Sequence, residues 1–209
     1  MANHIDVVYY INLDHRNDRK KEFLREMEKY GFNNVVRVSA IYDKDHGHLG
    51  CVKSHINTLE MFMKSNYKNC MICEDDLEFV CNPLPALNRF FDNKIRFDVC
   101  MLSGNVFDAR PIDNYDFIKK VYCVTTASGY IITKQFASVL LENFRESSIL
   151  LEKSFHEGTP ENPYDHYSAI DQYWCRIQGN SNWFIFEPKL GKQRMSYSDI
   201  DKRVKDMNL

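Results

Sequence analysis

Three consecutive carboxylates, Glu74, Asp75 and Asp76, follow directly on the apolar run of residues 70–73. Adjacent negative charges repel one another, so the end of a buried strand tolerates them poorly unless a cation or several hydrogen-bond donors lie nearby. Carboxylate oxygens are the ligands that hard divalent cations prefer. The pattern therefore predicts a divalent-metal site at the carboxyl end of a strand, where α/β proteins bind their ligands. The alternative is a solvated acidic turn.

The turn after the first apolar run carries two arginines. Residues 7–13 are β-branched and aromatic and predict a buried strand, whereas residues 18–30 have helical spacing. Asn12, Arg16 and Arg19 lie where this strand leads into the helix, and such a junction is a natural phosphate site. The alternative is a capped helix start with solvated arginines. The glycine-rich fingerprints of dinucleotide and P-loop sites are absent from this turn.

Two further segments place glycine beside polar side chains. Gly50, Ser54 and His55 lie at the start of a predicted helix, where glycine allows close approach of another backbone. His55 lies on the apolar face of that helix, so a satisfied core histidine is the simpler interpretation. Gly129 interrupts a strand pattern, which indicates either a bulge or a close approach to a ligand or another backbone.

Asp171 and Gln193 are candidates from the second half of the chain. Asp171 lies in the first turn of a predicted helix, where the helix dipole alone accounts for a carboxylate. It also follows a long polar segment, residues 154–167, and is therefore a candidate to accept a proton from a substrate hydroxyl. Gln193, beside Lys192, is a candidate to bind a diphosphate.

Strand and helix patterns alternate along the chain. Strands are predicted at residues 7–13, 35–41, 69–73, 97–102, 121–133 (interrupted at 127–129) and 183–186. Helices are predicted at 18–30, 50–66, 83–92, 134–145, 168–178 and 198–207, with polar loops at 42–49 and 154–167. This order is typical of βαβ units in an α/β fold with a largely parallel sheet. No linker divides the chain, so we expect a single domain over residues 1–209.

Composition narrows the class of protein. The 209 residues are 44% hydrophobic, which is enough to form a core. The net charge of -2 does not indicate a nucleic-acid-binding surface. No apolar segment is long enough to span a bilayer, and the first residues do not resemble a signal peptide. We therefore expect a cytoplasmic location, with membrane association only through a substrate. The oligomeric state is not encoded in any pattern.

The 7 cysteines are an odd number and mostly lie within strand or helix patterns. This distribution favours free thiols in a reducing compartment. Cys70 and Cys73 form a C-x-x-C motif, but on a strand they face opposite sides and no second pair exists, which argues against a zinc or redox site. The polar loop at 42–49 holds acidic and histidine residues whose spacing matches no standard metal site.

Taken together and in order, five short motifs resemble glycosyltransferase family 25, which includes lipooligosaccharide galactosyltransferases and the collagen galactosyltransferase domains. The motifs are Tyr10-Ile11-Asn12-Leu13-Asp14-x-Arg16-x-Asp18-Arg19, Gly50-Cys51-x-x-Ser54-His55, Glu74-Asp75-Asp76, Ser128-Gly129-Tyr130, and Pro188 with Gln193 and Ser198-Asp199. The resemblance runs over nearly the whole chain. It implies a GT-A-like single domain, a UDP-sugar donor, a divalent metal (Mn²⁺, or Mg²⁺) and inversion at the sugar carbon.

The resemblance assigns roles by position. Asp76 is the first choice of direct metal ligand, with Glu74 beside it, while Glu74 or Asp75 would hold ribose or a metal-bound water. The remaining donor-binding positions are Asn12, Arg16, Arg19, Gly50, Ser54, Gly129 and Gln193. The catalytic base is not fixed by any motif, and Asp171 is the candidate. The expected reaction moves galactose or glucose to a hydroxyl of a glycan, lipid-linked or protein acceptor.

Two alternatives remain open from the sequence. A nucleotidyltransferase that forms an activated sugar shares acidic strand ends and a nucleotide site, but it usually needs a basic, glycine-rich loop that this chain lacks. A catalytically inactive relative that binds carbohydrate or sugar nucleotide is disfavoured by the intact Glu74-Asp75-Asp76 triad.

Overall fold

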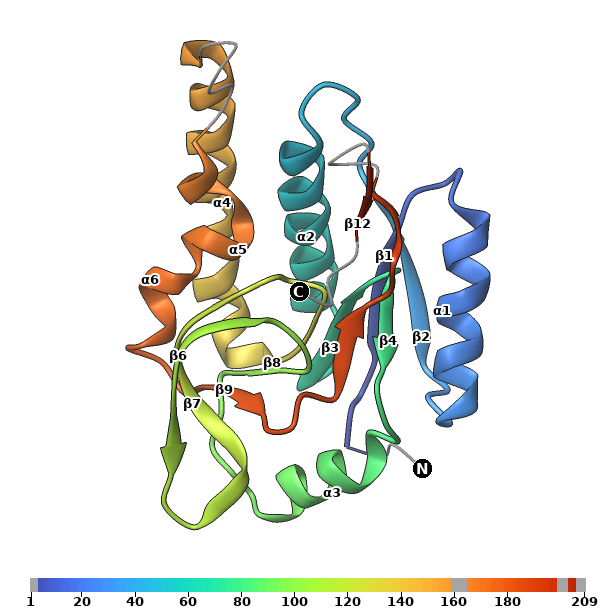
Figure 1. The fold of residues 1–209 in the computed structure, drawn as a ribbon, viewed down its shortest axis with the longest axis vertical. Coiled ribbons are helices and arrows are strands. Elements are labelled where there is room, and N and C mark those ends of the chain that lie inside the picture. Colours follow the sequence, from blue (N-terminus) through green and yellow to red (C-terminus); the bar gives the residue numbers. More distant parts are fainter. Residues whose placement is uncertain (1–3, 159–164, 199–202, 206–209) are drawn as a thin grey trace.

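The computed structural model describes residues 4–158, 165–198 and 203–205. Its centre is an eight-stranded mixed sheet with the strand order β2-β1-β3-β8-β5-β9-β7-β6 (Figure 1). The strands are β1 (Val8–Asn12), β2 (Val35–Ser39), β3 (Asn69–Glu74), β4 (Leu77–Phe79), β5 (Val99–Met101), β6 (Asn105–Ile112), β7 (Tyr115–Thr125), β8 (Gly129–Thr133), β9 (Trp183–Phe186), β10 (Gly191–Gln193), β11 (Ser196–Ser198) and β12 (Arg203–Lys205). The helices are α1 (Asn17–Lys29), α2 (Gly47–Lys64), α3 (Leu84–Asp92), α4 (Lys134–Glu157), the 3₁₀ helix η1 (His166–Ser168), α5 (Ile170–Tyr173) and α6 (Cys175–Gln178).

The amino-terminal half of the sheet is parallel. β1 pairs in parallel with both β2 and β3, so the polar residues that follow β1 and β3 emerge at the same edge. β8 then runs antiparallel between β3 and β5, and β6 and β7 form a long hairpin at the far side. Two short ribbons, β4 with β10 and β11 with β12, complete the described strands.

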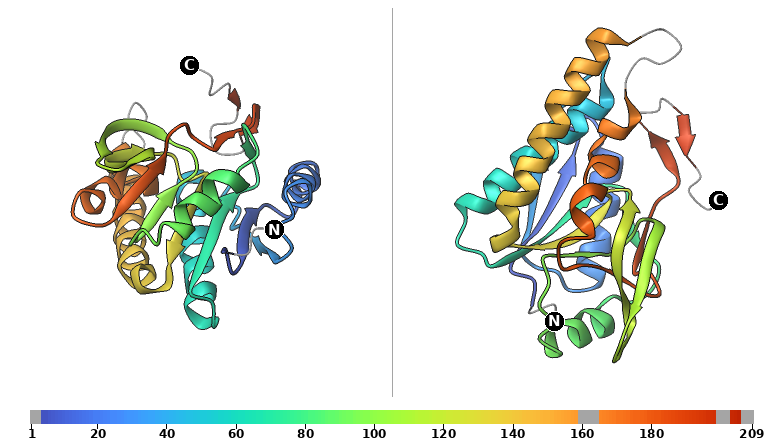
Figure 2. Two further views of the ribbon diagram at one scale, coloured as in Figure 1. Left: turned by 90° about the horizontal axis from the view of Figure 1, so that it is seen from below. Right: turned by 90° about the vertical axis from the view of Figure 1, so that its left-hand side faces the viewer.

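Side chains on the two faces of the sheet form two separate cores. Along β1, Tyr9 and Ile11 belong to the core under α2 and α4, whereas Val8 and Tyr10 belong to the core under α1 and α3. This alternation is the two-residue period of a strand covered on both faces. Figure 2 shows the long helices α2 and α4 lying together on one side of the sheet. The predicted α/β fold with a mixed sheet is therefore confirmed, although antiparallel pairings are at least as common as parallel ones in the described sheet.

Several predicted boundaries differ from the structure. The helix predicted at 134–145 continues to Glu157, because Leu151 on its inner face is also buried. The predicted loop at 154–167 is therefore helical at its start, and its residues 159–164 lie outside the described residues. The predicted helix at 168–178 is two short helices that meet at Trp174. The loop predicted at 42–49 ends early, because α2 already begins at Gly47.

The predicted helix at 198–207 is wrong where the structure describes it, because residues 196–198 and 203–205 pair as the antiparallel strands β11 and β12. Besides β11 and β12, the strands β4, β6 and β10 were not predicted. β6 is mostly exposed, so its residues lack the buried run or clean alternation that marks a strand in sequence. Within the described part of the chain, none of the helices has the length and apolar character needed to cross a bilayer.

Gly50 lies on α2 where the helix passes under the segment that follows β2. A Cβ added there would lie 2.5 Å from the carbonyl oxygen of Ile41 and 3.2 Å from the amide nitrogen of Asp43. The Ser54 hydroxyl lies on the same face, accepts from the Ile41 amide at 2.8 Å and donates to the Gly50 carbonyl at 2.6 Å. Glycine is thus required here for close backbone approach, as the sequence predicted.

We expect Gly50→Ala to lower the free energy of unfolding by about 2 kcal/mol, because backbone atoms rather than a flexible side chain must move. Met61→Ala, at an exposed position of the same helix, is the control and should change stability by no more than about 0.5 kcal/mol. Equal effects of the two variants in urea denaturation would contradict the packing argument.

Candidate active site

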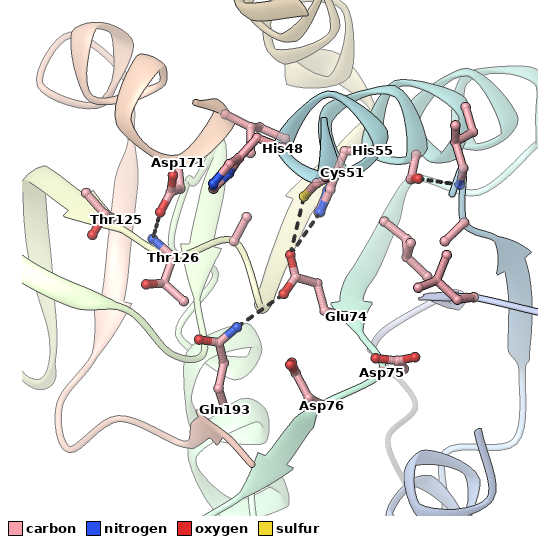
Figure 3. Close-up of a pocket in the computed structure, with 18 of the residues that line it drawn as sticks. His48, Cys51, His55, Glu74, Asp75, Asp76, Thr125, Thr126, Asp171 and Gln193 are labelled. Carbon is pink, nitrogen blue, oxygen red and sulfur yellow. Dashed lines mark hydrogen bonds and ion pairs between the residues drawn. The ribbon is translucent and has the colours of Figure 1, made fainter. Parts of the chain in front are cut away.

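A cavity of about 410 Å³ opens at the carboxyl ends of β1 and β3. Its walls come from these strand ends, from the first turns of α2, from α5 and from the segments that follow β7 and β10 (Figure 3). Of the residues predicted from sequence, the cavity is lined by Arg19, Ser54, Glu74, Asp75, Asp76, Asp171 and Gln193. The remaining predicted residues, Asn12, Arg16, Gly50 and Gly129, do not line the cavity.

Asp75 is held by two donors. Arg19 Nη1 lies 2.9 Å from one carboxylate oxygen, and Asn12 Nδ2 donates to the other at 2.7 Å. Arg37 in turn donates to the Asn12 side-chain oxygen at 2.9 Å, which fixes the orientation of the amide. Burial raises the pKa of Asp75 even though Arg19 and Asn12 act to lower it.

Asp76 has one satisfied oxygen and one that is not. Its Oδ2 accepts from Arg19 at 3.2 Å, whereas Oδ1 is buried and has no hydrogen-bond partner among the described residues. Burial, followed by the negative charge of Glu74, raises the pKa of Asp76 to about 7. An unpartnered buried carboxylate oxygen is costly, so this atom is a natural ligand for a cation.

Glu74 faces the opposite wall. Gln193 donates to its Oε2 at 3.2 Å, while His55 Nε2 and Cys51 Sγ lie 3.6 and 3.8 Å from its Oε1 (Figure 3). Burial would raise the pKa of Glu74, but the His55 contact, helped by Arg19, outweighs it and holds the pKa below its usual range. His55 is itself fixed by the Tyr130 hydroxyl at 3.1 Å, so it supports Glu74 from beneath.

Asp171 lies across the cavity from the carboxylate triad. The amide of Thr126, in the segment after β7, donates to Asp171 Oδ2 at 2.9 Å. Figure 3 shows Asp171 beside His48. Burial raises the pKa of Asp171, and the charge of Glu74 adds to the rise, while the Thr126 amide and His48 oppose it. A carboxylate with a raised pKa is a better proton acceptor than an ordinary surface aspartate.

Arg16 and Gly129 shape the site without lining it. Arg16 pairs with Asp18 at 2.9 Å and donates to the Tyr197 carbonyl at 3.0 Å, so it ties α1 to β11. Gly129 pairs with Cys73 across β8 and β3, and an added Cβ would lie 2.9 Å from the Leu77 side chain. Glycine there lets β4 pack directly behind the triad.

Several lining residues were not predicted from sequence. Phe107 and Tyr42 are 72% and 58% exposed and line the cavity. Phe107 lies on β6, which had no sequence signal. Arg194 also lines the cavity, and its amide donates to the Asp76 carbonyl at 2.7 Å while its side chain pairs with Glu78 at 3.0 Å. In the sequence, its position immediately after the candidate Gln193 is the signal that could have assigned Arg194 to the cavity.

The fold is that of GT-A glycosyltransferases. One similar solved structure is a glycosyltransferase involved in the glycosylation of the major capsid of PBCV-1, with a TM-score of 0.51 and 11% identity over 94% of this chain and 95% of that chain. A mutant of Drosophila β1,4-galactosyltransferase 7, in complex with manganese, UDP-Gal and xylobiose, aligns with a TM-score of 0.48 and 9% identity over 97% of this chain and 76% of that chain.

Sequence comparison identifies the family. Residues 45–154, more than half of the chain, match the profile of glycosyltransferase family 25 (LPS biosynthesis protein). The chain therefore belongs to glycosyltransferase family 25, and the matched segment contains α2, the carboxylate triad and β8. No curated protein matches the chain significantly.

We expect Arg19→Met to destabilise the metal-free protein by about 3 kcal/mol, because it leaves Asp75 and Asp76 without their buried cation. The Arg19 side chain is 12% exposed, and those of Asp75 and Asp76 are 8% and 13% exposed. The loss should be larger at about pH 8 than at about pH 5. The folded-state pKa of Asp76 is already raised to about 7, so at the lower pH this carboxyl is mostly neutral and needs the arginine less.

Arg145→Met is the matched control. Arg145 pairs with Glu60 at 2.9 Å, but the two side chains are 48% and 36% exposed. Such surface pairs contribute at most about 1 kcal/mol. Denaturant midpoints of both variants at the two pH values test the comparison, and a pH-independent loss in Arg19→Met would contradict it.

Proposed function

We propose that the protein transfers a hexose, galactose or glucose, from a UDP-sugar to a hydroxyl of a glycan, lipid-linked or protein acceptor, with a divalent metal and with inversion at the sugar carbon. The observation that carries this proposal is the placement of Glu74, Asp75 and Asp76 on one wall of the cavity and Asp171 on the other. The wall with the three carboxylates suits a cation and the negatively charged leaving group that it neutralises. The wall with Asp171 suits the acceptor hydroxyl.

The residues present fit a hard divalent cation. The buried and unpartnered Asp76 Oδ1, with Glu74 nearby, offers the oxygen ligands that Mn²⁺ or Mg²⁺ prefers. Such an ion, when bound, would neutralise the negative charge that builds up on the departing diphosphate. Cys51, His55 and Glu74 form a second possible ligand group, with ligand atoms within 4.8 Å of one another, but its sulfur and nitrogen atoms suit zinc better.

Donor binding is assigned to the triad side of the cavity. Arg19 lines it and is held by the Asp75 and Asp76 carboxylates and by the Tyr197 carbonyl, so its positive charge lies where a bound diphosphate would be. Gln193 lies against Glu74 and can donate to the diphosphate or sugar. In this proposal Asp75 holds ribose, while Asn12, Arg16, Gly50, Ser54 and Gly129 keep the surrounding backbone in place.

Acceptor binding is assigned to the opposite wall. Asp171 would take the proton of the acceptor hydroxyl, which attacks the anomeric carbon from the face opposite to the leaving diphosphate and so inverts it. Fixing both reactants in one cavity supplies part of the rate enhancement through proximity. The exposed rings of Phe107 and Tyr42 offer apolar surface on which a sugar can lie.

We expect Asp76→Asn to reduce Mn²⁺-dependent UDP release by at least about 100-fold, because the amide removes the negative charge that holds the cation. The substitution preserves shape, so the thermal midpoint should not fall. Asp45→Asn, in the exposed loop before α2, is the control and should keep normal activity. The assay combines candidate UDP-sugars with Mn²⁺, Mg²⁺ or a chelator.

Undiminished UDP release in Asp76→Asn would refute the metal assignment. Release of pyrophosphate from a nucleoside triphosphate and a sugar phosphate would instead identify a nucleotidyltransferase. UDP-sugar binding without hydrolysis or transfer, with every acceptor tried, would indicate an inactive relative.

We expect Asp171→Asn to lower kcat by about 100-fold or more with little change in UDP-sugar affinity. With Mn²⁺ at saturation, so that protonation of Asp76 does not limit metal binding, the wild-type rate should fall as the pH drops through the raised pKa of Asp171, because only the ionised carboxylate accepts a proton. The Asp171→Asn variant should lose this acidic limb, that is, the fall in rate at low pH. Asp113→Asn, in the exposed turn of the β6–β7 hairpin, should keep it. An unchanged acidic limb in Asp171→Asn would exclude this residue as the base.

A further inference from the structure

Two cysteines that are distant in sequence meet between β7 and α6. Cys123 lies on β7 and Cys175 begins α6, and their sulfur atoms are 2.8 Å apart. This separation is shorter than an ordinary contact between non-bonded sulfurs and only about 0.8 Å longer than a disulfide bond of about 2.05 Å. Both residues are partly exposed, so a small reagent can approach them. In the structure all seven cysteines are free thiols.

The backbone on each side of the pair is fixed by hydrogen bonds. Val124, next to Cys123, donates its amide to the Gln178 side chain at 2.8 Å, and its carbonyl accepts from that same side chain at 2.9 Å. The Trp174 indole, next to Cys175, donates to the same carbonyl at 2.8 Å. Gln178 and Trp174 are fully buried. These contacts hold the backbone beside both cysteines, so the two side chains extend toward each other from fixed positions.

A half-buried lysine adds a second clamp between the same elements. Lys120 on β7 donates to the carbonyls of Gln178 and Ser181 at 2.7 Å each. Figure 1 shows α6 lying beside the β6–β7 hairpin. By contrast, Cys70 and Cys73 belong to the cores on opposite faces of β3, so the C-x-x-C motif cannot close without disrupting that strand.

We propose that Cys123 and Cys175 form a reversible disulfide that fastens α6 to β7 when the protein meets a small-molecule disulfide such as oxidised glutathione. The Cys123 thiolate attacks one sulfur of the reagent, and the first glutathione leaves as a thiolate. The Cys175 thiolate then attacks the Cys123 sulfur and displaces the second glutathione. The protein gives up two electrons and two protons, and one glutathione disulfide becomes two glutathione thiols.

The bond would secure the wall that carries Asp171. Asp171 precedes Cys175 by one helical turn, and its carboxylate is bound by the amide of Thr126, three residues after Cys123. The sulfurs need to move by less than 1 Å, so the cavity should keep its shape. The proposal does not depend on the assigned reaction, because its test reads a covalent bond and thermal stability.

The test oxidises the full-length protein with oxidised glutathione at about pH 8 and digests it with trypsin without reduction. Burial, together with the neighbouring Cys123, raises the pKa of Cys175, so alkaline conditions and hours of incubation favour closure. Cleavage after Lys120, Lys134, Lys153 and Arg176 yields peptides 121–134 and 154–176, each with a single cysteine. We expect one linked peptide of their summed mass less two hydrogens, which reductant splits.

Cys123→Ser and Cys175→Ser should each abolish the linked peptide, whereas Cys81→Ser, which removes an exposed thiol, should retain it. Oxidation should raise the Tm of the wild type and Cys81→Ser by about 5 °C or more, and that of the other two variants not at all. Glutathione attached to Cys81 with peptides 121–134 and 154–176 left unlinked would overturn the proposal. A linked peptide without a rise in Tm would overturn the proposal that the disulfide fastens α6 to β7.

Discussion

The site depends on the concentration of three carboxylates at the buried end of β3. Glu74, Asp75 and Asp76 are each partly or fully removed from water, and neighbouring negative charges in such a place are unfavourable without compensation. Arg19 supplies the main compensating charge, because one of its nitrogens lies within 3.2 Å of both Asp75 and Asp76. The compensation is incomplete, since Asp76 Oδ1 has no partner among the described residues. The negative charge that Arg19 leaves uncompensated makes this position suitable for a cation.

Different parts of the fold supply the groups that hold each carboxylate. β1 and α1 provide Asn12 and Arg19, α2 provides His55 and β10 provides Gln193. The parallel pairing of β1 with β3 brings the first of these to the triad, and the β10–β4 ribbon brings the last. Small residues permit these approaches: Gly50 lets the segment after β2 cross α2, and Gly129 lets β4 pack behind the triad. The α/β fold therefore brings hydrogen-bond donors from several elements together at one edge of the sheet.

The convergence of these segments at one sheet edge could be predicted because its signals are local. An apolar run that ends in three acids, and a strand that leads into a helix through arginines, can be recognised from neighbouring residues alone, and the structure brings these segments together. The strand at 183–186 was likewise predicted at its observed bounds, because four consecutive apolar and aromatic residues are buried there. Asp171 was placed near the site by its position after a long polar segment, yet its contact with Thr126 depends on the β7–β8 connection, which no local pattern encodes.

What the sequence could not predict depends on tertiary contacts. β6 has mostly exposed residues and forms only because it pairs with β7, so Phe107 could not be assigned to the cavity in advance. A helix was predicted for the charged segment 198–207, whereas residues 196–198 and 203–205 pair as antiparallel strands. The proximity of Cys123 to Cys175 arises in the same way, because 52 residues separate them in the chain.

Diffraction from crystals soaked with Mn²⁺ and UDP tests the central claim most directly. The account predicts an anomalous manganese peak within about 2.5 Å of an Asp76 carboxylate oxygen, with the diphosphate beside it and the uridine on the Arg19 side of the cavity. Manganese and nucleotide bound together at a distance from residues 74–76 would contradict it.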